Sequence, residues 1–452
     1  MRASLLGLVA LAASLPSTAL AQRPIRYTLD NGLSVALDPI PGRATVSVVV
    51  SVDAGLRDQP EGWSGLAHLT EHLMFDGTPA APGHVLTSLE RLGATAFNGM
   101  TTQDATVYVE VVPASALEQT LWLEAERFAH GLDGTTEADV EAQRRVLERE
   151  RAQREFGREE VWDLVGHALY PSGHPYARGR EQADDVAAIR LRDVRWFFER
   201  HYGPDMLTLA ISGGFDPEDA RRWIERYFSP LRRGPTARPP EWVVPPLVRL
   251  DGERRILADA PRSTDLLYVA WPTPPLGERS DAALDLAARH LQARLRQRLL
   301  GSGEAVEVDV WLESHALASR FSVWIAVPSR QGTLAPLRAL DAELARMHEG
   351  GVSEASFQRA LRALRDHHAR ILDSPIYRGW LQATRWPRLP GGYDAPSTRW
   401  ARYEAVSRED VGRAAERYLP RTDRLVVSIA GRRHAPPRGR IVRELVVHPE
   451  SR

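Results

Sequence analysis

The chain has 452 residues, of which 43% are hydrophobic and 26% charged, so it is long enough for more than one domain with a large core. Its 58 basic residues nearly balance 59 acidic ones, which does not favour nucleic acid or an acidic membrane surface as a partner. There is no cysteine, and this excludes disulfides, thiolate metal ligands and a lipidated cysteine.

The first 21 residues have the features of a cleaved signal peptide. Arg2 provides a positive charge, residues 5–15 form an apolar run too short to span a bilayer, and residues 19–21 fit a small-residue cleavage site. The alternative is a buried N-terminal helix, but the three features occur in the expected order. We therefore expect a mature chain that starts at Gln22 and is periplasmic or secreted. No later stretch is apolar for long enough to be a transmembrane helix.

The hydrophobic pattern predicts alternating strands and helices in the first half of the chain. A strand at residues 45–52 and a polar loop precede a short helix at 65–75, and another helix is expected at 84–92. Two strand-like runs follow within residues 94–112, around the pair Asn98-Gly99, which is typical of a turn. The later elements are helices at 114–130, 136–157, 193–201 and 217–228 and a strand at 206–212.

The second half repeats features of the first. Residues 410–431 resemble residues 193–214, and residues 323–328 resemble residues 108–113, in both cases at an offset of about 215 residues. Two chance strand–helix junctions are the alternative, but two separate segments share nearly one offset.

These patterns predict an α+β fold. It consists of two duplicated α/β-sandwich domains of about 210 residues, each a mixed sheet with helices packed on it. We expect an N-terminal domain at residues 22–231 and a C-terminal domain at 247–452. The segment between them, 232–246, contains five prolines and is the predicted linker.

His68, Glu71 and His72 form a candidate metal site on the predicted helix at 65–75. Histidines four residues apart lie on one helix face, where both imidazoles can bind one tetrahedral zinc ion. A carboxylate beside them can take a proton from a water molecule on the metal. The order His-x-x-Glu-His is typical of inverzincin metallopeptidases, although such a pentapeptide also occurs on helices without metal. The second half contains no such motif, so we expect the chemistry in the first half only.

A catalytic zinc site usually has three protein ligands, so a third ligand must come from elsewhere in the chain. The charged helix predicted at 136–157 offers Glu141, Glu148, Glu150 and Glu155. Most residues of such a helix form a solvated face, and spacing alone does not choose among the four.

Residues 65–78, with a Gly-Leu-Ala-His start and a Phe-x-Gly-Thr end, resemble the zinc helix of the pitrilysin, insulysin and mitochondrial processing peptidase family. The resemblance covers most of residues 25–230 and, more weakly, the second half. The other segments that carry it are Phe97-Asn98 with Thr101, Asp104, Thr106 and Tyr108, and residues 123–128, 174–176, 202–204 and 213–216.

The resemblance implies a Zn²⁺ site formed by His68, His72 and Glu150. In the family, the third ligand is a glutamate four residues after a valine, and here Glu150 follows Val146 at that distance. Glu148 is the rival candidate.

The resemblance also implies roles around the metal. Glu71 would activate the zinc-bound water for hydrolysis of a peptide bond. Asn98 would lie on an edge strand and bind the substrate backbone, although an Asn-Gly pair also favours a turn. Some family members have a second acid seven residues before the metal-binding glutamate, and here that position is Gln143.

The chain departs from the family in its second half. An arginine and a tyrosine usually stabilise the oxyanion there, but the corresponding positions are Leu300 and Glu307, which cannot donate to it. We therefore expect a heterodimer in which a paralogous subunit supplies the Arg/Tyr pair. Arg294, Arg296 and Arg298 are an alternative source, although a solvated basic helix face is more typical of such a run.

The sequence thus predicts a zinc-dependent metalloendopeptidase that hydrolyses unstructured peptides. A catalytically inactive peptide-binding or assembly subunit of the same fold is the first alternative. The intact motif argues against it, because loss of metal ligands marks such family members. A metal-binding regulator without hydrolytic activity is the second alternative.

Overall fold

The structure is a computed structural model of the chain. It describes residues 24–153, 158–171, 173–178, 182–234, 247–260, 262–329, 331–384, 396–432 and 440–447. The expected signal peptide lies outside the described residues, as does most of the expected linker. We refer to residues 24–234 as the first half and to residues 247–447 as the second half.

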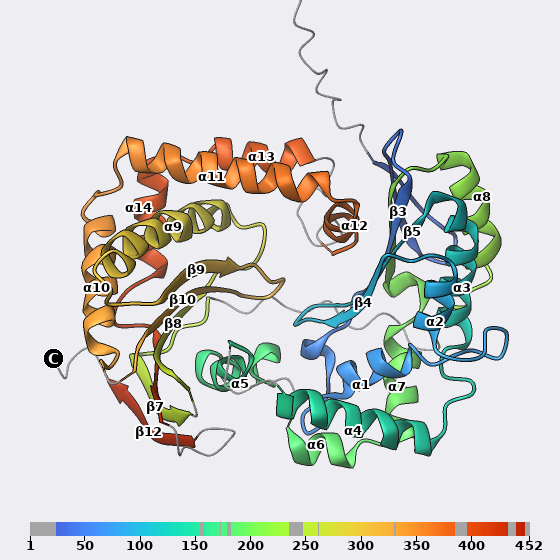
Figure 1. Cartoon of the computed structure of the whole chain (residues 1–452), viewed down its shortest axis with the longest axis horizontal. Coiled ribbons are helices and arrows are strands. Elements are labelled where there is room, and N and C mark those ends of the chain that lie inside the picture. The colour runs from blue at the N-terminus through green and yellow to red at the C-terminus, as the bar shows by residue number, and fades with distance from the viewer. Residues whose placement is uncertain are drawn as a thin grey trace, which may run out of the picture.

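The first half contains a six-stranded mixed sheet (Figure 1). Its strand order is β1-β2-β6-β3-β5-β4; β2 and β6 are parallel, and all other neighbours are antiparallel. The last strand in this order, β4, forms one edge of the sheet. The strands are β1 (Ile25–Thr28), β2 (Ser34–Pro39), β3 (Thr45–Val52), β4 (Ala96–Thr101), β5 (Thr106–Pro113) and β6 (Leu207–Gly213).

The second half contains an equivalent sheet in the order β12-β7-β11-β8-β10-β9. Here β7 and β11 are parallel and the other neighbours antiparallel, so the two sheets share one pattern of strand directions. The strands are β7 (Glu253–Ala260), β8 (Thr264–Thr273), β9 (Glu307–Glu313), β10 (Ser319–Pro328), β11 (Leu425–Gly431) and β12 (Arg440–Val447). The predicted α+β fold with two duplicated sandwiches is confirmed.

The two sheets differ in the part of the chain that provides one edge strand. In the first sheet, β1 precedes its antiparallel partner β2 in the chain, whereas in the second sheet the equivalent strand β12 comes last and pairs with β7. The repeated segments occupy equivalent places: residues 108–113 lie in β5 and residues 323–328 in β10.

Helices surround each sheet. Those of the first half are α1 (Leu66–Leu73), α2 (Val85–Arg91), α3 (Leu117–His130), α4 (Glu137–Gln153), α5 (Arg158–Leu169), α6 (Ala183–Ala188), α7 (Leu191–His201) and α8 (Pro217–Phe228). Those of the second half are α9 (Arg279–Leu295), α10 (Leu334–His348), α11 (Glu354–Asp373), α12 (Pro375–Thr384), α13 (Pro396–Glu404) and α14 (Arg408–Tyr418).

Each half contributes one helix to the sheet of the other half, and Figure 1 shows both helices between the sheets. Helix α12 of the second half covers the first sheet, where Ala383 joins Val49 and Val107 in one buried cluster. Helix α5 of the first half covers the second sheet with Val161 and Val165. Because both faces of each sheet are covered, the central strands of the first sheet are buried at nearly every position rather than at alternate ones.

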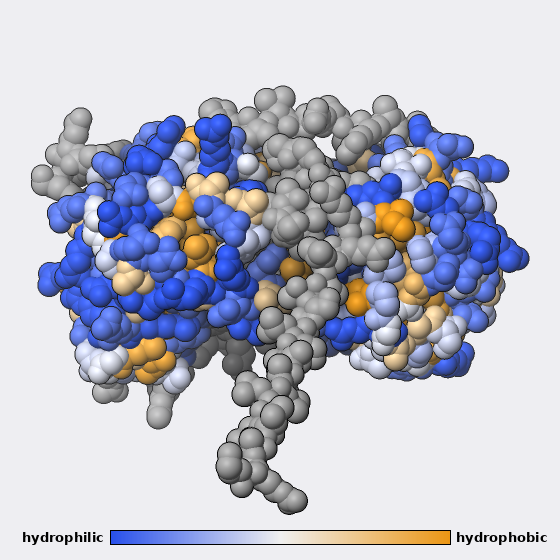
Figure 2. Space-filling view, turned by 90° about the horizontal axis from the view of Figure 1, so that it is seen from above, coloured by the Kyte–Doolittle hydropathy of each residue, from blue (hydrophilic) through white to orange (hydrophobic). Residues whose placement is uncertain are grey.

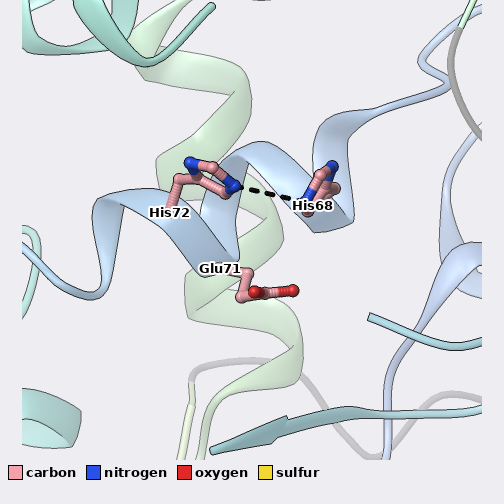
Figure 3. A group of neighbouring side chains, drawn as sticks. All are labelled: His68, Glu71 and His72. Carbon is pink, nitrogen blue, oxygen red and sulfur yellow. Dashed lines mark hydrogen bonds between the residues drawn. The ribbon is translucent and has the colours of Figure 1, made fainter. Parts of the chain in front are cut away.

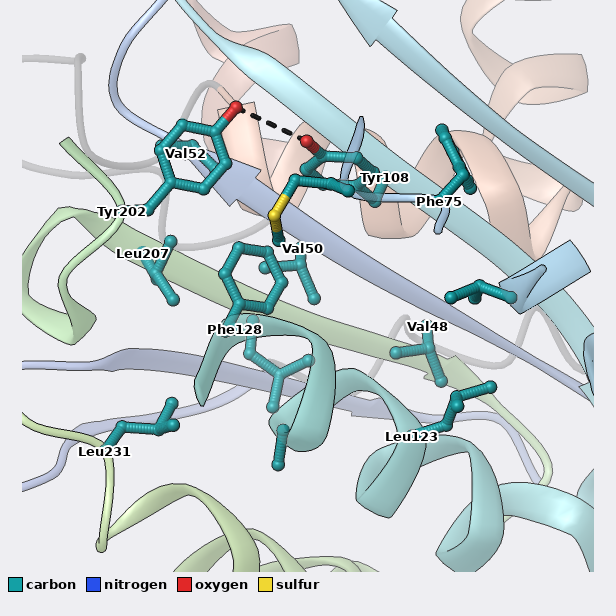
Figure 4. Packing of buried hydrophobic residues seen from close by; sticks show 14 of the residues in the cluster. Val48, Val50, Val52, Phe75, Tyr108, Leu123, Phe128, Tyr202, Leu207 and Leu231 are labelled. Carbon is teal, nitrogen blue, oxygen red and sulfur yellow. Dashed lines mark hydrogen bonds between the residues drawn. The ribbon is translucent and has the colours of Figure 1, made fainter. Parts of the chain in front are cut away.

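Strand β3 shows this burial on both faces. Its residues Val48 and Val50 face α3, where Val50 lies beside Phe128 and Val48 beside Leu123 (Figure 4), while Val49 faces α12. A β-carbon on Gly379 of α12 would lie 2.8 Å from the Val49 side chain, so a residue without a side chain is needed for this close approach.

Asn98 lies on an edge strand, as the resemblance implied, and the alternative of a turn at Asn98-Gly99 is wrong. Both residues lie inside β4, and the chain reverses at residues 102–105. There the Thr102 amide donates to the Ala105 carbonyl at 2.8 Å, and the Thr102 hydroxyl binds both main-chain groups of Ala105. The Thr102 side chain therefore stabilises the turn of this hairpin, and the Asn98-Gly99 pair is part of the strand.

Figure 2 shows the halves as neighbouring lobes, with a described surface that is mostly hydrophilic and carries hydrophobic residues in small groups. Among the helices of the described residues, none combines the length and the apolar character needed to cross a membrane.

Candidate metal centre

Helix α1 packs one face against the core of the first half, and its other face borders a cavity. Leu66, Leu69 and Leu73 recur at three- and four-residue spacing and are fully buried in the core of the first half. Gly65 precedes the helix with φ of 92°, a left-handed conformation that favours glycine. This register turns His68 and His72 to the cavity.

The two imidazoles point towards one place. Their Nε2 atoms lie 3.2 Å apart, and Figure 3 shows the rings projecting from successive turns of α1. The Glu150 carboxylate of α4 lies opposite them. Its Oε1 is 3.6 Å from Nε2 of His72, and its Oε2 is 3.8 Å from Nε2 of His68.

These three distances fit one tetrahedral metal ion. With metal–ligand bonds of about 2.0–2.1 Å, the ligand atoms of a tetrahedral zinc site lie roughly 3.3–3.4 Å apart. Two imidazoles and one carboxylate are also a donor set that zinc uses in catalytic sites. The chemistry and the spacing of these side chains therefore suit a zinc ion, with room for a fourth ligand.

Helix α4 presents Glu150, not Glu148, to the imidazoles. Gln143, Val146 and Glu150 follow one another at three- and four-residue spacing and all line the cavity. Glu148 is exposed to solvent and does not line it. The structure thus brings together His68, His72 and Glu150.

Glu71 lies beside the imidazoles, and β4 holds its carboxylate. The Thr101 hydroxyl donates a hydrogen bond to Oε2 at 2.5 Å. A β-carbon on Gly99 would lie 2.5 Å from Oε1, so the glycine leaves space for the carboxylate. Residues 99 and 101 share one face of the strand. Glu71 is only 5% exposed, so these contacts restrict its orientation.

The second nitrogen of His72 also has a partner. Its Nδ1 lies 3.3 Å from Oε1 of Gln143. If Nδ1 carries the proton, it donates to the amide oxygen, and Nε2 keeps its lone pair for the metal. Some family members have a second acid at this position of the helix. Here Gln143 contacts His72 through its amide group instead.

A cavity of about 580 Å³ adjoins the metal centre. Asn98 lines it from β4 and is exposed, so the structure places this residue beside the metal-binding side chains. The wall also has an apolar part formed by Phe75, Leu86, Phe97 and Val146, with His84 stacked on Phe75.

A group of buried polar residues packs against Phe75, which lines the cavity. The Arg127 guanidinium donates to Glu110 at 3.1 Å and to Glu124, and all three are fully buried. It also lies over the Tyr108 ring, 4.3 Å from its centroid. Burial raises the pKa of Tyr108 well above its usual value, with further contributions from Tyr202 and Glu71, so this phenol stays neutral. Figure 4 shows its hydroxyl bonded to that of Tyr202.

The second half has no hydrogen-bond donor side chain at Leu300 and Glu307, the two positions at which the resemblance implies an oxyanion pair. Leu300 is apolar and partly exposed, and the Glu307 carboxylate accepts a hydrogen bond from the Trp324 indole at 3.2 Å. Arg294 pairs with Glu343 at 3.2 Å, and Arg296 pairs with Asp309 at 2.6 Å. Both arginines therefore have partners within the second half.

Sequence reasoning missed the role of Thr101 and the apolar part of the cavity wall. A small residue and a hydroxyl at alternate positions of one strand, as in Gly99-Met100-Thr101, are the signal that could have located the contact with Glu71.

Comparison with known families gives two consecutive matches. Residues 34–171 match the model described as insulinase (peptidase family M16). Residues 188–364 match the model described as the peptidase M16 inactive domain. The metal motif therefore lies in the first match.

Curated relatives include subunits of larger assemblies and proteins named as proteases. Subunit beta of the mitochondrial-processing peptidase of Caenorhabditis elegans is 28% identical over 221 residues, 48% of this chain and 47% of that protein. An uncharacterized zinc protease of Mycobacterium leprae is 28% identical over 357 residues, 75% of this chain and 77% of that protein. The chain matches about half the length of the mitochondrial relatives.

Solved structures share the fold over most of the chain. A protease from Helicobacter pylori has a TM-score of 0.81 at 20% identity and covers 90% of this chain and 99% of its own. An M16-like peptidase from Alicyclobacillus acidocaldarius has a TM-score of 0.77 at 20% identity, with 90% and 98% covered. At these identities, the likeness concerns the fold.

Proposed function

Because the chain belongs to the M16 family of peptidases, we propose that it is a zinc-dependent endopeptidase that hydrolyses unstructured peptides. In this proposal His68, His72 and Glu150 bind the zinc ion, and Glu71 is the general base. The observation that carries the proposal is the convergence of three donors at distances of 3.2, 3.6 and 3.8 Å, with a buried carboxylate beside them.

When bound, a zinc ion would lower the pKa of a water molecule and polarise the carbonyl group of the substrate. Glu71 accepts the proton of the attacking water and passes it to the leaving amine. The Thr101 hydroxyl orients the carboxylate for both transfers through its hydrogen bond to Oε2. Gln143 keeps the ring of His72 in place through Nδ1.

The substrate lies along β4 in this proposal. This strand forms the edge of the first sheet, so an extended peptide can pair with its main chain, as in other cases of strand addition. The exposed side chain of Asn98 is in position to bind the peptide backbone next to the metal centre. Only an unfolded segment can present its main chain in this way, which favours unstructured peptides as substrates.

The protein acts as the zinc-bearing subunit of a heterodimer in this proposal. The support is the lack of donors at Leu300 and Glu307, together with relatives named as subunits of the mitochondrial-processing peptidase and of the cytochrome b-c1 complex. A paralogous subunit would supply the arginine and tyrosine that stabilise the oxyanion.

We further propose that the protein is exported and acts in the periplasm or outside the cell. The support is the signal-like sequence of residues 1–21.

Metal analysis and peptide cleavage test the enzymatic proposal together. The purified chain, alone and with its paralogue, is freed of metal with a chelator and then given zinc and unstructured peptides. We expect one zinc ion per chain and cleavage that requires zinc. Glu150→Gln should lose the metal, whereas the matched variant Glu148→Gln on the same helix should keep it. A chain that binds no zinc, or cleaves equally well without it, contradicts the proposal.

An inactive peptide-binding subunit of the same fold is the second candidate. Two observations favour it: the missing oxyanion donors at Leu300 and Glu307 and the match of residues 188–364 to a domain described as inactive. Saturable peptide binding without cleavage, in the zinc-loaded chain with and without its paralogue, would support this candidate.

A further inference from the structure

Asp104 lies at the boundary between the two halves and accepts hydrogen bonds from both. From the first half, Nη1 of Arg57 donates to its Oδ1 at 2.9 Å, and the Tyr176 hydroxyl donates to the same atom at 2.5 Å. From the second half, the amide of Ala316 donates to its Oδ2 at 2.8 Å. The carboxylate is only 7% exposed, so water does not replace these donors easily.

The segment of the second half that meets Asp104 is the loop between β9 and β10. Besides Ala316, the amide of Leu317 donates to the Tyr176 hydroxyl at 2.9 Å. Nδ1 of His315 lies 3.7 Å from Oδ2 of Asp104, and its Nε2 lies 3.7 Å from the Glu313 carboxylate. His315 therefore lies between an acid of each half.

The loop is also fixed within its own half. The Ser314 hydroxyl donates to Asp281 at 2.7 Å, and the amide of Leu276 donates to the His315 carbonyl at 2.8 Å. A loop held in this way moves only together with the sheet that carries it. Its contacts with Asp104 and Tyr176 thus report the relative position of the halves.

On the other side, Asp104 belongs to the turn that ends β4. Thr101, three residues earlier, is the donor to Glu71. The turn itself is bound by main-chain hydrogen bonds from Leu56 to Thr102 and from Arg57 to Gln103. A β-carbon on Gly55 would lie 2.4 Å from the Thr102 carbonyl oxygen, so this packing is close. Displacement of Asp104 is therefore transmitted to the end of β4 that holds Glu71.

We propose that Asp104 and His315 are positioning residues, whose contact between the two halves holds the end of β4 and thereby orients Glu71. The inference rests on the proposed role of Glu71 for its effect on catalysis, whereas the coupling between the halves is a property of the contacts themselves. When the halves separate, Asp104 loses the amide of Ala316 and the charge of His315, and Thr101 is less firmly placed.

The contact depends on the protonation of His315. Burial alone would lower the pKa of this imidazole, but its close contacts with the carboxylates of Asp104 and Glu313 outweigh burial, so the pKa is raised above its usual value. The surrounding groups are Asp104, Glu313 with its partner Arg320, Tyr176, and Arg57, which pairs with Asp104. The protonated ring is favoured while the halves are in contact, so the contact weakens as the pH rises through this raised pKa.

Hydrogen exchange of the zinc-loaded full chain, and kinetics of this chain with its paralogous subunit, test the proposal. The variants are Asp104→Asn and His315→Gln, with Thr333→Val as matched control because it removes a side-chain hydrogen bond, to Ser428, that stays within the second half and away from this loop. We expect both test variants to bind zinc normally and to exchange the β4 amides of residues 99–101 several-fold faster. We also expect kcat to fall about tenfold to a hundredfold, as for small misplacements of a catalytic group, with KM changed much less.

The pH dependence of amide exchange in β4 distinguishes the effect of the His315 proton from that of other titratable groups. After correction for the intrinsic effect of pH on amide exchange, the β4 amides of wild type should exchange faster as the pH rises, because His315 loses its proton. The corrected rates of His315→Gln should not change with pH in this way, since this variant has no imidazole to titrate.

Each outcome decides the proposal. If the amide exchange of β4 and the kcat of both variants match those of Thr333→Val, Asp104 and His315 are not positioning residues. If wild type with its paralogous subunit cleaves no peptide, the proposed function fails, and the exchange of β4 alone then supports or overturns the coupling between the halves.

Discussion

The Thr101 hydroxyl donates a hydrogen bond to the Glu71 carboxylate across 2.5 Å, from the edge strand to the helix that carries both histidines. A negative charge that is almost fully buried needs such a donor. Through this contact, the strand that is proposed to bind the substrate also orients the proposed general base. Small displacements of β4 are therefore expected to change catalysis without changing the metal ligands.

We expect Thr101→Val to keep zinc and to lose about tenfold to a hundredfold in kcat, because the carboxylate of Glu71 is no longer oriented. Zinc content and steady-state kinetics measure the two effects. Thr120→Val is a suitable control, since Thr120 is equally buried and its hydroxyl donates to the carbonyl of Ala116, directly before α3 and away from Glu71. A Thr101 variant as active as this control would show that the contact has no catalytic role.

We expect Gln143→Ala to weaken zinc binding about tenfold to a hundredfold, which is typical when a residue that orients a metal-binding histidine is removed. The reason is that Nδ1 of His72 loses its partner at 3.3 Å. Gln143→Glu keeps an acceptor at this position and should retain or increase affinity. Competition with a chromophoric chelator measures the dissociation constants, and equal affinity in all three proteins would contradict this role.

Arg127→Met should destabilise the fold strongly, because it leaves Glu110 and Glu124 buried without their cation. Burial, followed by the charge of Glu124, already raises the pKa of Glu110 well above its usual value. Loss of one partner from a buried ionic group costs about 3–5 kcal/mol of unfolding free energy. Arg413→Met removes an exposed ion pair with Asp410 and should cost at most about 1 kcal/mol. Denaturant unfolding compares them, and similar losses would contradict the prediction.

The local elements can be predicted from sequence because their signals are local. Helix α8 runs from Pro217 to Phe228 as expected, since Asp216 caps its first turn and the apolar residues recur with helical spacing. The helix that carries His68 and His72 has an equally local signal. The Asn98-Gly99 pair is misleading because a turn propensity competes with strand pairing, and here the pairing with β5 prevails.

The site as a whole depends on packing between distant segments, which sequence spacing does not reveal. Whether Glu148 or Glu150 faces the histidines is decided by the rotation of α4, and this is fixed by burial of Val140 and Leu147 in the core. The exchange of α5 and α12 between the sheets and the approach of His315 to Asp104 join segments that lie far apart in the chain. No periodicity in either segment marks its partner.

The stability of the fold should fall when the pH drops below about 6.5, in part through His201. Burial, followed by the charge of Arg200, lowers the pKa of this histidine from 6.5 to about 4, and among the described residues neither ring nitrogen has a hydrogen-bond partner. The unfolded chain therefore takes up the proton at a higher pH than the fold does. The contribution of the neutral ring is complete above about pH 6.5 and is lost progressively towards pH 4.

We expect His201→Leu to flatten this dependence, seen as a smaller difference in Tm between about pH 7 and about pH 5. His130→Gln removes an exposed imidazole and should leave the difference as in wild type. If the Tm of the His201 variant still falls as steeply as that of wild type, the acid sensitivity belongs to other groups.

The most direct test of the account is the peptidase activity of Glu71→Gln in comparison with wild type at equal zinc content, each assayed with the paralogous subunit present. The account predicts that the variant binds zinc as wild type does and loses about a hundredfold to ten-thousandfold in kcat, the range that general acid–base catalysis supplies. Activity within tenfold of wild type in a variant of equal zinc content would contradict it.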